Sequence, residues 1–277
     1  MAITFNEHDV ESEPLASGVT RRRLLTERRV AGTKIRLDRI DLAAGASFVV
    51  DVNATDLAWF QMLEDRASLR HGESTTELGR SHIVFLPPGF HGTISTRSGA
   101  ALLYAQVPDA RRFDAKFDPA ALSLRVVDWM REPVLDSQYD ARKRIYVVTP
   151  KLFGTRAIKG EMIIYPPGTQ AANHHHEGAE HFMYVLQGRG TAYANEQPIP
   201  VRKGDLIYYG ERERHYLKSE GTEDMVFVEF FVPGEYTTVW AEGAPVCTWR
   251  PTGSDLRGQA PARDIKGHSS ASVPADV

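Results

Sequence analysis

The sequence has little of several features that would assign it to a class at once. It contains one cysteine, Cys247, which excludes an internal disulfide and fits a reducing cytoplasm. Acidic and basic residues nearly balance, at 36 and 33, and the net charge of -3 gives no support for a nucleic-acid or membrane-surface partner. No apolar stretch approaches the ~20 residues of a membrane helix. The opening MAITFNEHDVESEP lacks an apolar core, so we expect no secretory signal and a cytoplasmic protein.

Long helical periodicity is also scarce, and residues 110–122 are the best candidate for a short helix or linker. Short segments with apolar residues at every second position recur instead, such as SFVVDV, HIVFLP, EMIIYPPG and MVFVEFFV. Turn-forming stretches such as AGA and PPG separate them. This pattern predicts an all-β protein made of antiparallel strands.

The two halves of the chain share a spaced motif, which indicates an internal repeat. With an offset of 123 residues, the aligned pairs are Gly45 with Gly168, Asp51 with His174, and Asn53 with His176. A second alignment places His91 opposite His215, at an offset of 124 residues. Two early histidines of the second copy therefore correspond to Asp and Asn in the first.

The stretch NHHHEGAEH concentrates four of the ten histidines of the chain. Residues two apart on a strand share a face, so His174 and His176 project together while His175 points away. Such a pair is half of a metal site, because a transition metal needs several ligands that converge on it. A neighbouring strand would supply a third ligand from Glu180 or His181, and these adjacent residues face opposite sides.

The stretch GTQAANHHHEGAEHFMYVLQG resembles the first sequence signature of the cupin superfamily, and GDLIYYGERERHYLKS resembles the second, which ends in a metal-binding His. The resemblance covers residues 35–250 and implies two tandem cupin modules, each a jelly-roll barrel of the double-stranded β-helix type. The Pro-x-Gly that usually precedes the last His is absent here. In this resemblance His215 is the last ligand, and it is the only histidine between residues 182 and 267.

The spacing of the first signature bears on the choice of the third ligand. In that signature six residues separate the Glu from the Gly. Six residues lie between His181 and Gly188, which places His181 at the Glu position, whereas seven residues lie between Glu180 and Gly188. The resemblance therefore implies a site of His174, His176, His181 and His215 that holds one divalent transition metal. We expect iron or manganese, with copper, nickel and zinc as alternatives, since imidazole alone does not select among these metals.

Three further residues are candidates for roles beside the metal. Tyr209 and Arg214 could orient a substrate carboxylate. Glu229 lies between large apolar residues in FVEFF and so needs a partner. It could act as a general base, accept a hydrogen bond from a ligand imidazole, or form an ordinary cross-strand pair with an Arg.

The pattern suggests five regions. We expect an N-terminal arm (1–30), a degenerate cupin module without metal (31–115), a linker (116–140), a metal-binding cupin module (141–249) and a flexible C-terminal tail (250–277). In the first module Asp51, Asn53 and Ala58 replace the usual ligands, and His91 alone cannot hold a metal. That module is expected to serve packing or assembly.

Cupin architecture does not fix a reaction, so three classes remain open. The first is a mononuclear-metal dioxygenase acting on a small anionic substrate, because the all-histidine site resembles those of gentisate- and diketone-type dioxygenases. The second is a non-oxidative hydrolase, lyase or isomerase similar to ureidoglycine aminohydrolases, whose first and last ligands are Glu and Gln where this chain has His174 and His215. The third is a non-catalytic cupin that binds a small molecule. We expect the dioxygenase first, and a homodimer.

Overall fold

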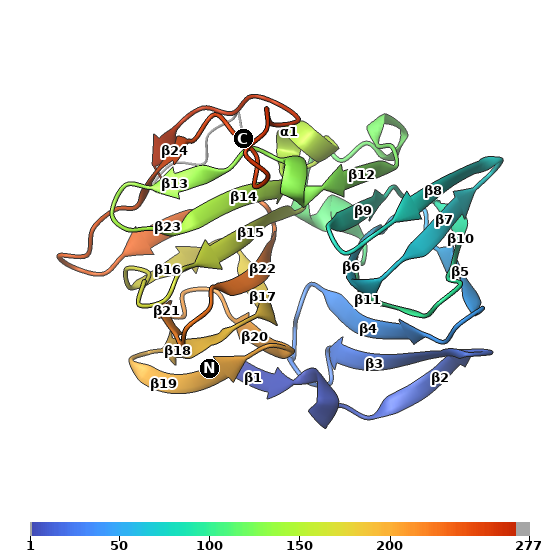
Figure 1. Cartoon of the computed structure of the whole chain (residues 1–277), viewed down its shortest axis with the longest axis horizontal. Coiled ribbons are helices and arrows are strands. Elements are labelled where there is room, and N and C mark those ends of the chain that lie inside the picture. Colours follow the sequence, from blue (N-terminus) through green and yellow to red (C-terminus); the bar gives the residue numbers. More distant parts are fainter. Residues whose placement is uncertain (1, 270–277) are drawn as a thin grey trace. The chain divides into compact units, whose positions relative to one another are not determined.

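The computed structural model describes residues 2–269. The chain divides into two compact units, one formed by residues 7–128 and the other by residues 1–6 together with the chain from 129 onward. Figure 1 shows that strands dominate both units. No helix in the described part of the chain combines the length and the apolar character that crossing a bilayer requires.

The unit of residues 7–128, called here the N-terminal barrel, consists of two sheets. In sheet order, the seven-stranded sheet contains β12 (Arg125–Asp128), β9 (His82–Leu86), β6 (Leu57–Asp65), β11 (Ala100–Val107), β4 (Arg36–Leu42), β3 (Val19–Leu25) and β2 (Ser12–Ala16). The four-stranded sheet contains β5 (Ser47–Asp51), β10 (His91–Ser95), β7 (Ala67–His71) and β8 (Ser74–Leu78).

The second unit, called here the C-terminal barrel, also consists of two sheets. In sheet order, the nine-stranded sheet contains β1 (Ile3–Asn6), β20 (Asp205–Tyr209), β17 (Glu180–Gln187), β22 (Met225–Val232), β15 (Lys159–Tyr165), β14 (Lys143–Val148), β13 (Leu135–Ser137), β24 (Thr248–Pro251) and β25 (His268–Ser269). The five-stranded sheet contains β19 (Gln197–Arg202), β18 (Arg189–Ala194), β21 (His215–Glu220), β16 (His174–Glu177) and β23 (Thr237–Trp240).

Helical structure is confined to short segments. The α-helix α1 (Pro150–Phe153) is accompanied by 3₁₀ turns at Glu7–Asp9, Ala110–Phe113, Pro119–Ala121 and Trp129–Arg131. In α1, the Thr149 hydroxyl accepts a hydrogen bond from the amide of Leu152 at 3.2 Å, and Gly154 ends the helix with a φ of 74°. The helix or linker expected at 110–122 is thus two single turns.

Each barrel has its apolar core between its two sheets. In the N-terminal barrel, Phe60 and Leu102 of one sheet pack in the same buried cluster as Val50 and Ile94 of the other. In the C-terminal barrel, a second cluster joins Val185, Ile207 and Phe227 to Ala192 and Leu217. The strand pairings are antiparallel. The expected all-β fold of two jelly-roll barrels is therefore confirmed.

The backbone explains the glycine of the first signature. Gly188 follows β17 with a φ of 75°, and a Cβ atom there would lie 2.5 Å from the carbonyl oxygen of Asp224. A residue with a side chain would be both strained and too close to the neighbouring backbone. Glycine at this position lets β17 turn into β18 beside the histidine-bearing strands.

The segments expected to be an arm and a flexible tail are held in hydrogen-bonded structure where the structure describes them. Residues of β1 pair with β20, with Ile3 opposite Tyr208. At the other end, Trp249 of β24 pairs with His268 of β25, and the Tyr146 hydroxyl lies 2.7 Å from the His268 Nε2 atom. Residues 270–277, the end of the expected tail, lie outside the described residues. A composition rich in Gly, Pro, Ala and Ser gave no sign of these specific pairings.

Candidate metal centre and its cavity

Both sheets of the C-terminal barrel contribute histidines to one place in its interior. His174 and His176 lie on β16, and His174 is directly opposite His215 of the neighbouring strand β21. His181 comes from β17 in the other sheet. The alternation of β16 directs its first and third residues to one face, as the His-x-His spacing predicts.

Three of these histidines form a group that could hold a metal ion. One ring nitrogen from each of His174, His176 and His215 lies within 4.8 Å of the others. The ring of His181 is adjacent, with its centroid 4.6 Å from that of His215 and 4.9 Å from that of His176. The described chain therefore offers a three-histidine group with a fourth imidazole beside it.

Hydrogen bonds at the Nδ1 atoms fix the orientation of the three rings. The Nδ1 atom of His174 lies 2.8 Å from the carbonyl oxygen of Ala172, and that of His215 lies 2.7 Å from the carbonyl oxygen of Glu213. The Nδ1 atom of His176 lies 3.2 Å from the Thr238 hydroxyl. A carbonyl oxygen can only accept, so His174 and His215 donate from Nδ1 and keep a lone pair on Nε2. This arrangement is the one that metal-binding histidines use.

The nitrogen atoms left over are buried and unsatisfied. Among residues 2–269, no hydrogen-bond partner reaches the Nε2 atom of His215 or either ring nitrogen of His181. A buried polar atom without a partner costs free energy, unless an ion or ligand satisfies it. The donor set therefore fits a divalent transition metal, which binds neutral imidazole nitrogen.

Burial keeps the imidazoles in the form that binds metal. Loss of hydration lowers the pKa of His174 to about 4 and that of His181 to about 3. The same cause, together with the neighbouring histidines, lowers the pKa of His176 and of His215 well below the usual range. All four rings are therefore neutral at neutral pH, and no proton has to leave before a metal binds.

The two alternatives for the third ligand point in different directions. The ring of His181 stacks on Phe231 and Tyr209, with centroid distances of 4.8 and 5.2 Å, beside the three-histidine group. Glu180 instead accepts a hydrogen bond of 2.8 Å from the Tyr208 hydroxyl. The geometry thus brings His181, and not Glu180, to the other histidines.

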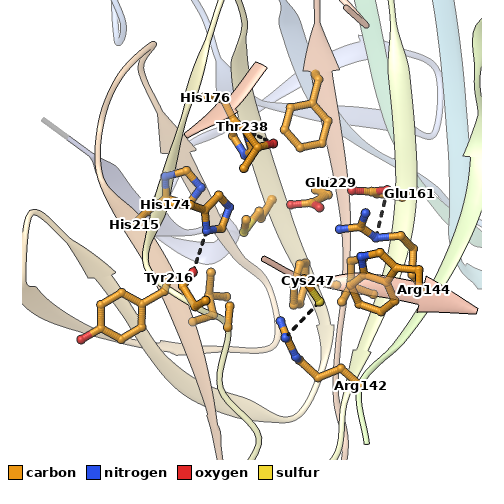
Figure 2. A pocket seen from close by; sticks show the side chains of 18 of the residues that line it. Arg142, Arg144, Glu161, His174, His176, His215, Tyr216, Glu229, Thr238 and Cys247 are labelled. Carbon is orange, nitrogen blue, oxygen red and sulfur yellow. Dashed lines mark hydrogen bonds and ion pairs between the residues drawn. The ribbon is translucent and has the colours of Figure 1, made fainter. Parts of the chain in front are cut away.

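A cavity lies next to the three-histidine group. The volume that the centres of water molecules can occupy in it is about 60 Å³, and one water needs about 10–15 Å³. The cavity can therefore hold a small organic molecule. His174, His176 and His215 line one side of it. Figure 2 shows Glu161, Glu229 and Arg144 on another side, with Arg142 and Cys247 below them.

Two carboxyl groups in the cavity wall share one negative charge. Glu161 of β15 is directly opposite Glu229 of β22. The Arg144 Nε atom lies 3.3 Å from Glu161, and the Lys159 ammonium lies 4.0 Å from it. These cations lower the pKa of Glu161 against the effect of burial. Burial and the charge of Glu161 raise the pKa of Glu229 well above its usual range, so Glu229 holds the proton.

Comparison with known proteins gives a family match for part of the C-terminal barrel and a fold match for most of the chain. A model of the cupin domain matches residues 161–231. An uncharacterized protein of Methanocaldococcus jannaschii is 33% identical over 58 residues, which are 21% of this chain, and the match spans about half, 46%, of that relative. A mutant of Bacillus subtilis oxalate decarboxylase has a TM-score of 0.67 at 16% identity, covering 86% of this chain and 78% of its own. Protein Ylba from E. coli has a TM-score of 0.68 at 12% identity, covering 84% of this chain and 91% of its own.

Residues 161–231 match the cupin domain, and the chain has the fold of the solved cupin structures. At these low identities the solved structures establish the cupin fold, and the chemistry of this cupin has to be argued from its own side chains.

The other predicted residues of the cupin site lie in three different settings. Glu229 lines the cavity directly opposite Glu161, and the Arg144 guanidinium pairs with Glu161. Tyr209 is fully buried and stacks on His215 at 4.3 Å, but its hydroxyl has no partner within residues 2–269. Arg214 is exposed and is not among the residues that line the cavity. Alternation explains this, because the neighbouring His215 faces inward.

Sequence reasoning missed much of the cavity wall. The missed polar and aromatic residues are Arg142, Arg144, Lys159, Glu161, Tyr165, Trp249 and His268. Part of the signal was present, because ARKRIYVV has Arg142, Arg144 and Tyr146 at every second position, which puts Arg144 and Tyr146 on one face of β14 with Arg142 just before that strand. What the pattern could not show is that this face lines the same interior as β16 and β21.

Proposed function

We propose that this cupin is a metal-dependent enzyme that acts on a small organic anion in the cavity of its C-terminal barrel. The observation that carries the proposal is the three-histidine group, whose Nδ1 atoms are held by Ala172, Glu213 and Thr238. His181 is the proposed fourth ligand. Iron and manganese are the first metals to consider, with copper, nickel and zinc as alternatives.

An anionic substrate follows from the charge of the site. Neutral imidazoles leave a bound divalent ion its full charge, so oxyanions of a substrate are attracted to it. Such a metal would polarise the oxygen atoms of a bound substrate and, in the case of iron, could also supply electrons to O2. The protein contributes a largely closed cavity with Phe231, Tyr236 and Trp240 in its wall, which limits water around a reacting molecule.

The first reaction class to test is a mononuclear dioxygenase. The all-imidazole donor set and the aromatic wall support it, since both suit a small enolic or aromatic anion that chelates through two oxygens. The fold neighbours give no independent support for a reaction, because the oxalate decarboxylase variant shares only 16% of its residues with this chain.

A specific observation favours a second candidate, a non-oxidative hydrolase, lyase or isomerase. Glu229 faces the cavity and keeps a proton next to an ionised carboxylate. A neutral carboxyl group at that place can give a proton to a substrate atom, and Glu161 with Arg144 and Lys159 can stabilise the charge that remains. Bond-breaking with proton transfer would use this pair directly.

One sample distinguishes these classes. The protein, purified without an affinity tag or added metal, is analysed for metals and then screened for O2 uptake with catecholic, gentisate-like and 1,3-dicarbonyl compounds. About one iron or copper per chain with substrate-dependent O2 uptake supports the dioxygenase. About one manganese, nickel or zinc per chain without O2 uptake supports the second class, and ammonia release from ureido compounds is then measured. A protein that retains no metal contradicts both.

A cytoplasmic homodimer remains a prediction.

A further inference from the structure

Arg142 occupies a particular place in the wall of the C-terminal barrel. It lies just before β14 and is 5% exposed, and its guanidinium lines both the inner cavity and a shallower outer pocket. The outer pocket leaves about 230 Å³ to the centres of water molecules and includes Tyr139 and Pro245. Figure 2 shows the guanidinium and the histidines on different sides of the inner cavity.

The guanidinium of Arg142 is held rigidly by three neighbours. Its Nε atom donates to Asp140 at 2.7 Å, one terminal nitrogen donates to the Tyr165 hydroxyl at 3.1 Å, and the other lies 3.6 Å from the sulfur of Cys247. The group also lies over the Tyr165 ring, 5.1 Å from its centroid. Because the forked guanidinium group, called the fork below, is already fixed, little conformational entropy is lost when it binds a planar anion.

Two donors of this fork remain free. A guanidinium has five N–H groups, and the contacts within residues 2–269 use three of those of Arg142. The remaining two belong to the two terminal nitrogens, one to each. Paired terminal N–H groups are those that bind a carboxylate in the bidentate manner.

The charges around Arg142 leave room for an added anion. Arg142, Arg144 and Lys159 are the cationic side chains of the cavity wall in the described chain. Glu161 lies beside Arg144 and Asp140 beside Arg142, whereas Glu229 keeps its proton and burial lowers the pKa of Lys159. Asp140 contacts the guanidinium of Arg142 at its Nε atom, so a carboxylate on the terminal N–H groups would further stabilise this buried cation.

We infer that Arg142 binds a carboxylate of the substrate, so that the substrate is a small molecule with a carboxylate at one end and a metal-binding oxyanion at the other. The inference rests on the proposed function for the metal-facing end only. The outer pocket, which shares Arg142, Cys247, Ala171 and Ala172 with the cavity, is the route by which such an anion reaches the fork.

The test uses three probes of equal size and different charge: malonate, malonamate and malonamide. Calorimetric titration of the full-length, metal-loaded protein should rank them in that order of affinity. Arg142→Gln should weaken malonate binding about 10- to 100-fold, because one charged bidentate contact is lost, and should leave malonamide unchanged. Arg142→Lys should recover part of the loss, since a point charge cannot replace the fork. The exposed Arg250, changed to Gln, is the matched control and should leave all three affinities unchanged.

A structural role for Arg142 gives a different result. If Arg142→Gln fails to fold, Arg142→Lys and Tyr165→Phe carry the test, and the latter should weaken malonate binding about 3- to 10-fold by freeing the fork. Malonate affinity that is unchanged in the folded variants overturns the inference, as does a wild-type protein that binds the three probes equally.

Metal content separates this inference from the proposed function. Elemental analysis of the same samples should give equal metal in the wild type and in all Arg142 variants. A wild-type protein without metal contradicts the proposed function. The inference about Arg142 is then judged on that metal-free protein, where a loss of malonate binding in Arg142→Gln supports it and equal binding overturns it.

Discussion

In the C-terminal barrel, His174 of β16 lies opposite His215 of β21, and both line the cavity. In the N-terminal barrel, β5 and β10 pair in the same register, with Asp51 opposite His91. There the two side chains are 71% and 72% exposed and form a hydrogen-bonded pair of 2.5 Å. Equivalent positions of the repeat thus face a buried cavity in one barrel and solvent in the other.

The strands beside these positions account for the difference. β16 lies between β21 and β23, and Trp240 of β23 covers His174 with a centroid distance of 5.0 Å. β5 is an edge strand of its sheet among the described residues, so no further strand covers Asp51. The interior of the N-terminal barrel is filled by apolar side chains such as Phe60 and Val84. A barrel can therefore keep buried polar groups where a ligand satisfies them, and otherwise fills its interior with apolar groups.

The largest effect is expected from removing a histidine of the metal group. His176→Ala takes away a central ligand, so metal content should fall from about one ion per chain to nearly none. Elemental analysis of untagged protein measures this. The control is His91→Ala, which we expect to retain the wild-type metal content because His91 is exposed and pairs with Asp51. Full metal in His176→Ala would falsify the assignment of the site.

A core substitution in the N-terminal barrel should separate stability from metal binding. Phe60 is completely buried, and Phe60→Ala should lower the free energy of unfolding by about 3–5 kcal/mol through the cavity it leaves. Urea unfolding measures the loss. The protein that remains folded should still carry the wild-type amount of metal per chain. A loss of metal from this folded protein would show that the two barrels do not have separate roles.

The choice between the adjacent residues of β17 predicts a smaller, measurable change. His181→Ala should weaken metal binding about 10- to 100-fold, because one imidazole beside the group is lost. Glu180→Ala removes only the acceptor of the Tyr208 hydroxyl and should leave metal affinity close to that of the wild type. Competition with a metal chelator measures both affinities, and the opposite ranking would make Glu180 the ligand.

The carboxyl pair predicts a dependence of stability on pH. Burial and the charge of Glu161 raise the pKa of Glu229 in the folded protein, so folding favours the protonated form. That contribution is complete below the unfolded pKa of about 4.5 and is lost as the pH rises towards the folded value. Gln keeps a donor towards Glu161 and cannot ionise. Glu229→Gln should therefore become more stable relative to the wild type as the pH rises from 4 to 8, in thermal unfolding at each pH. A constant difference would mean that Glu229 is ionised.

The smallest effect is expected at the exposed pair of the N-terminal barrel. Asp51→Ala removes a solvent-exposed contact with His91, which should change stability by no more than about 1 kcal/mol. Metal stoichiometry should stay at the wild-type value. A drop in metal content would show that the N-terminal barrel also binds an ion.

Local patterns were sufficient for those parts of the fold and site that depend on neighbouring residues. Period-2 runs predicted the strands, and the two sequence signatures predicted four histidines, of which the structure groups His174, His176 and His215 with His181 beside them. Trp249 was missed because it reaches the cavity through the pairing of β24 with β13, which are distant in sequence. Arg142 was missed because no local pattern shows that the segment before β14 lines the cavity. The same holds for His268, which pairs with Trp249 from a segment whose composition resembles a loose tail.

The pairing of β1 with β20 has a consequence for the synthesis of the chain. The strand Ile3–Asn6 is made about 200 residues before its partner Asp205–Tyr209, an interval that at 5–20 residues per second lasts about 10–40 s. The whole N-terminal barrel is translated within that interval and can fold while β1 still lacks its neighbour. For that time an unpaired strand is open to strands of other nascent chains, and a chaperone that holds extended segments would protect it.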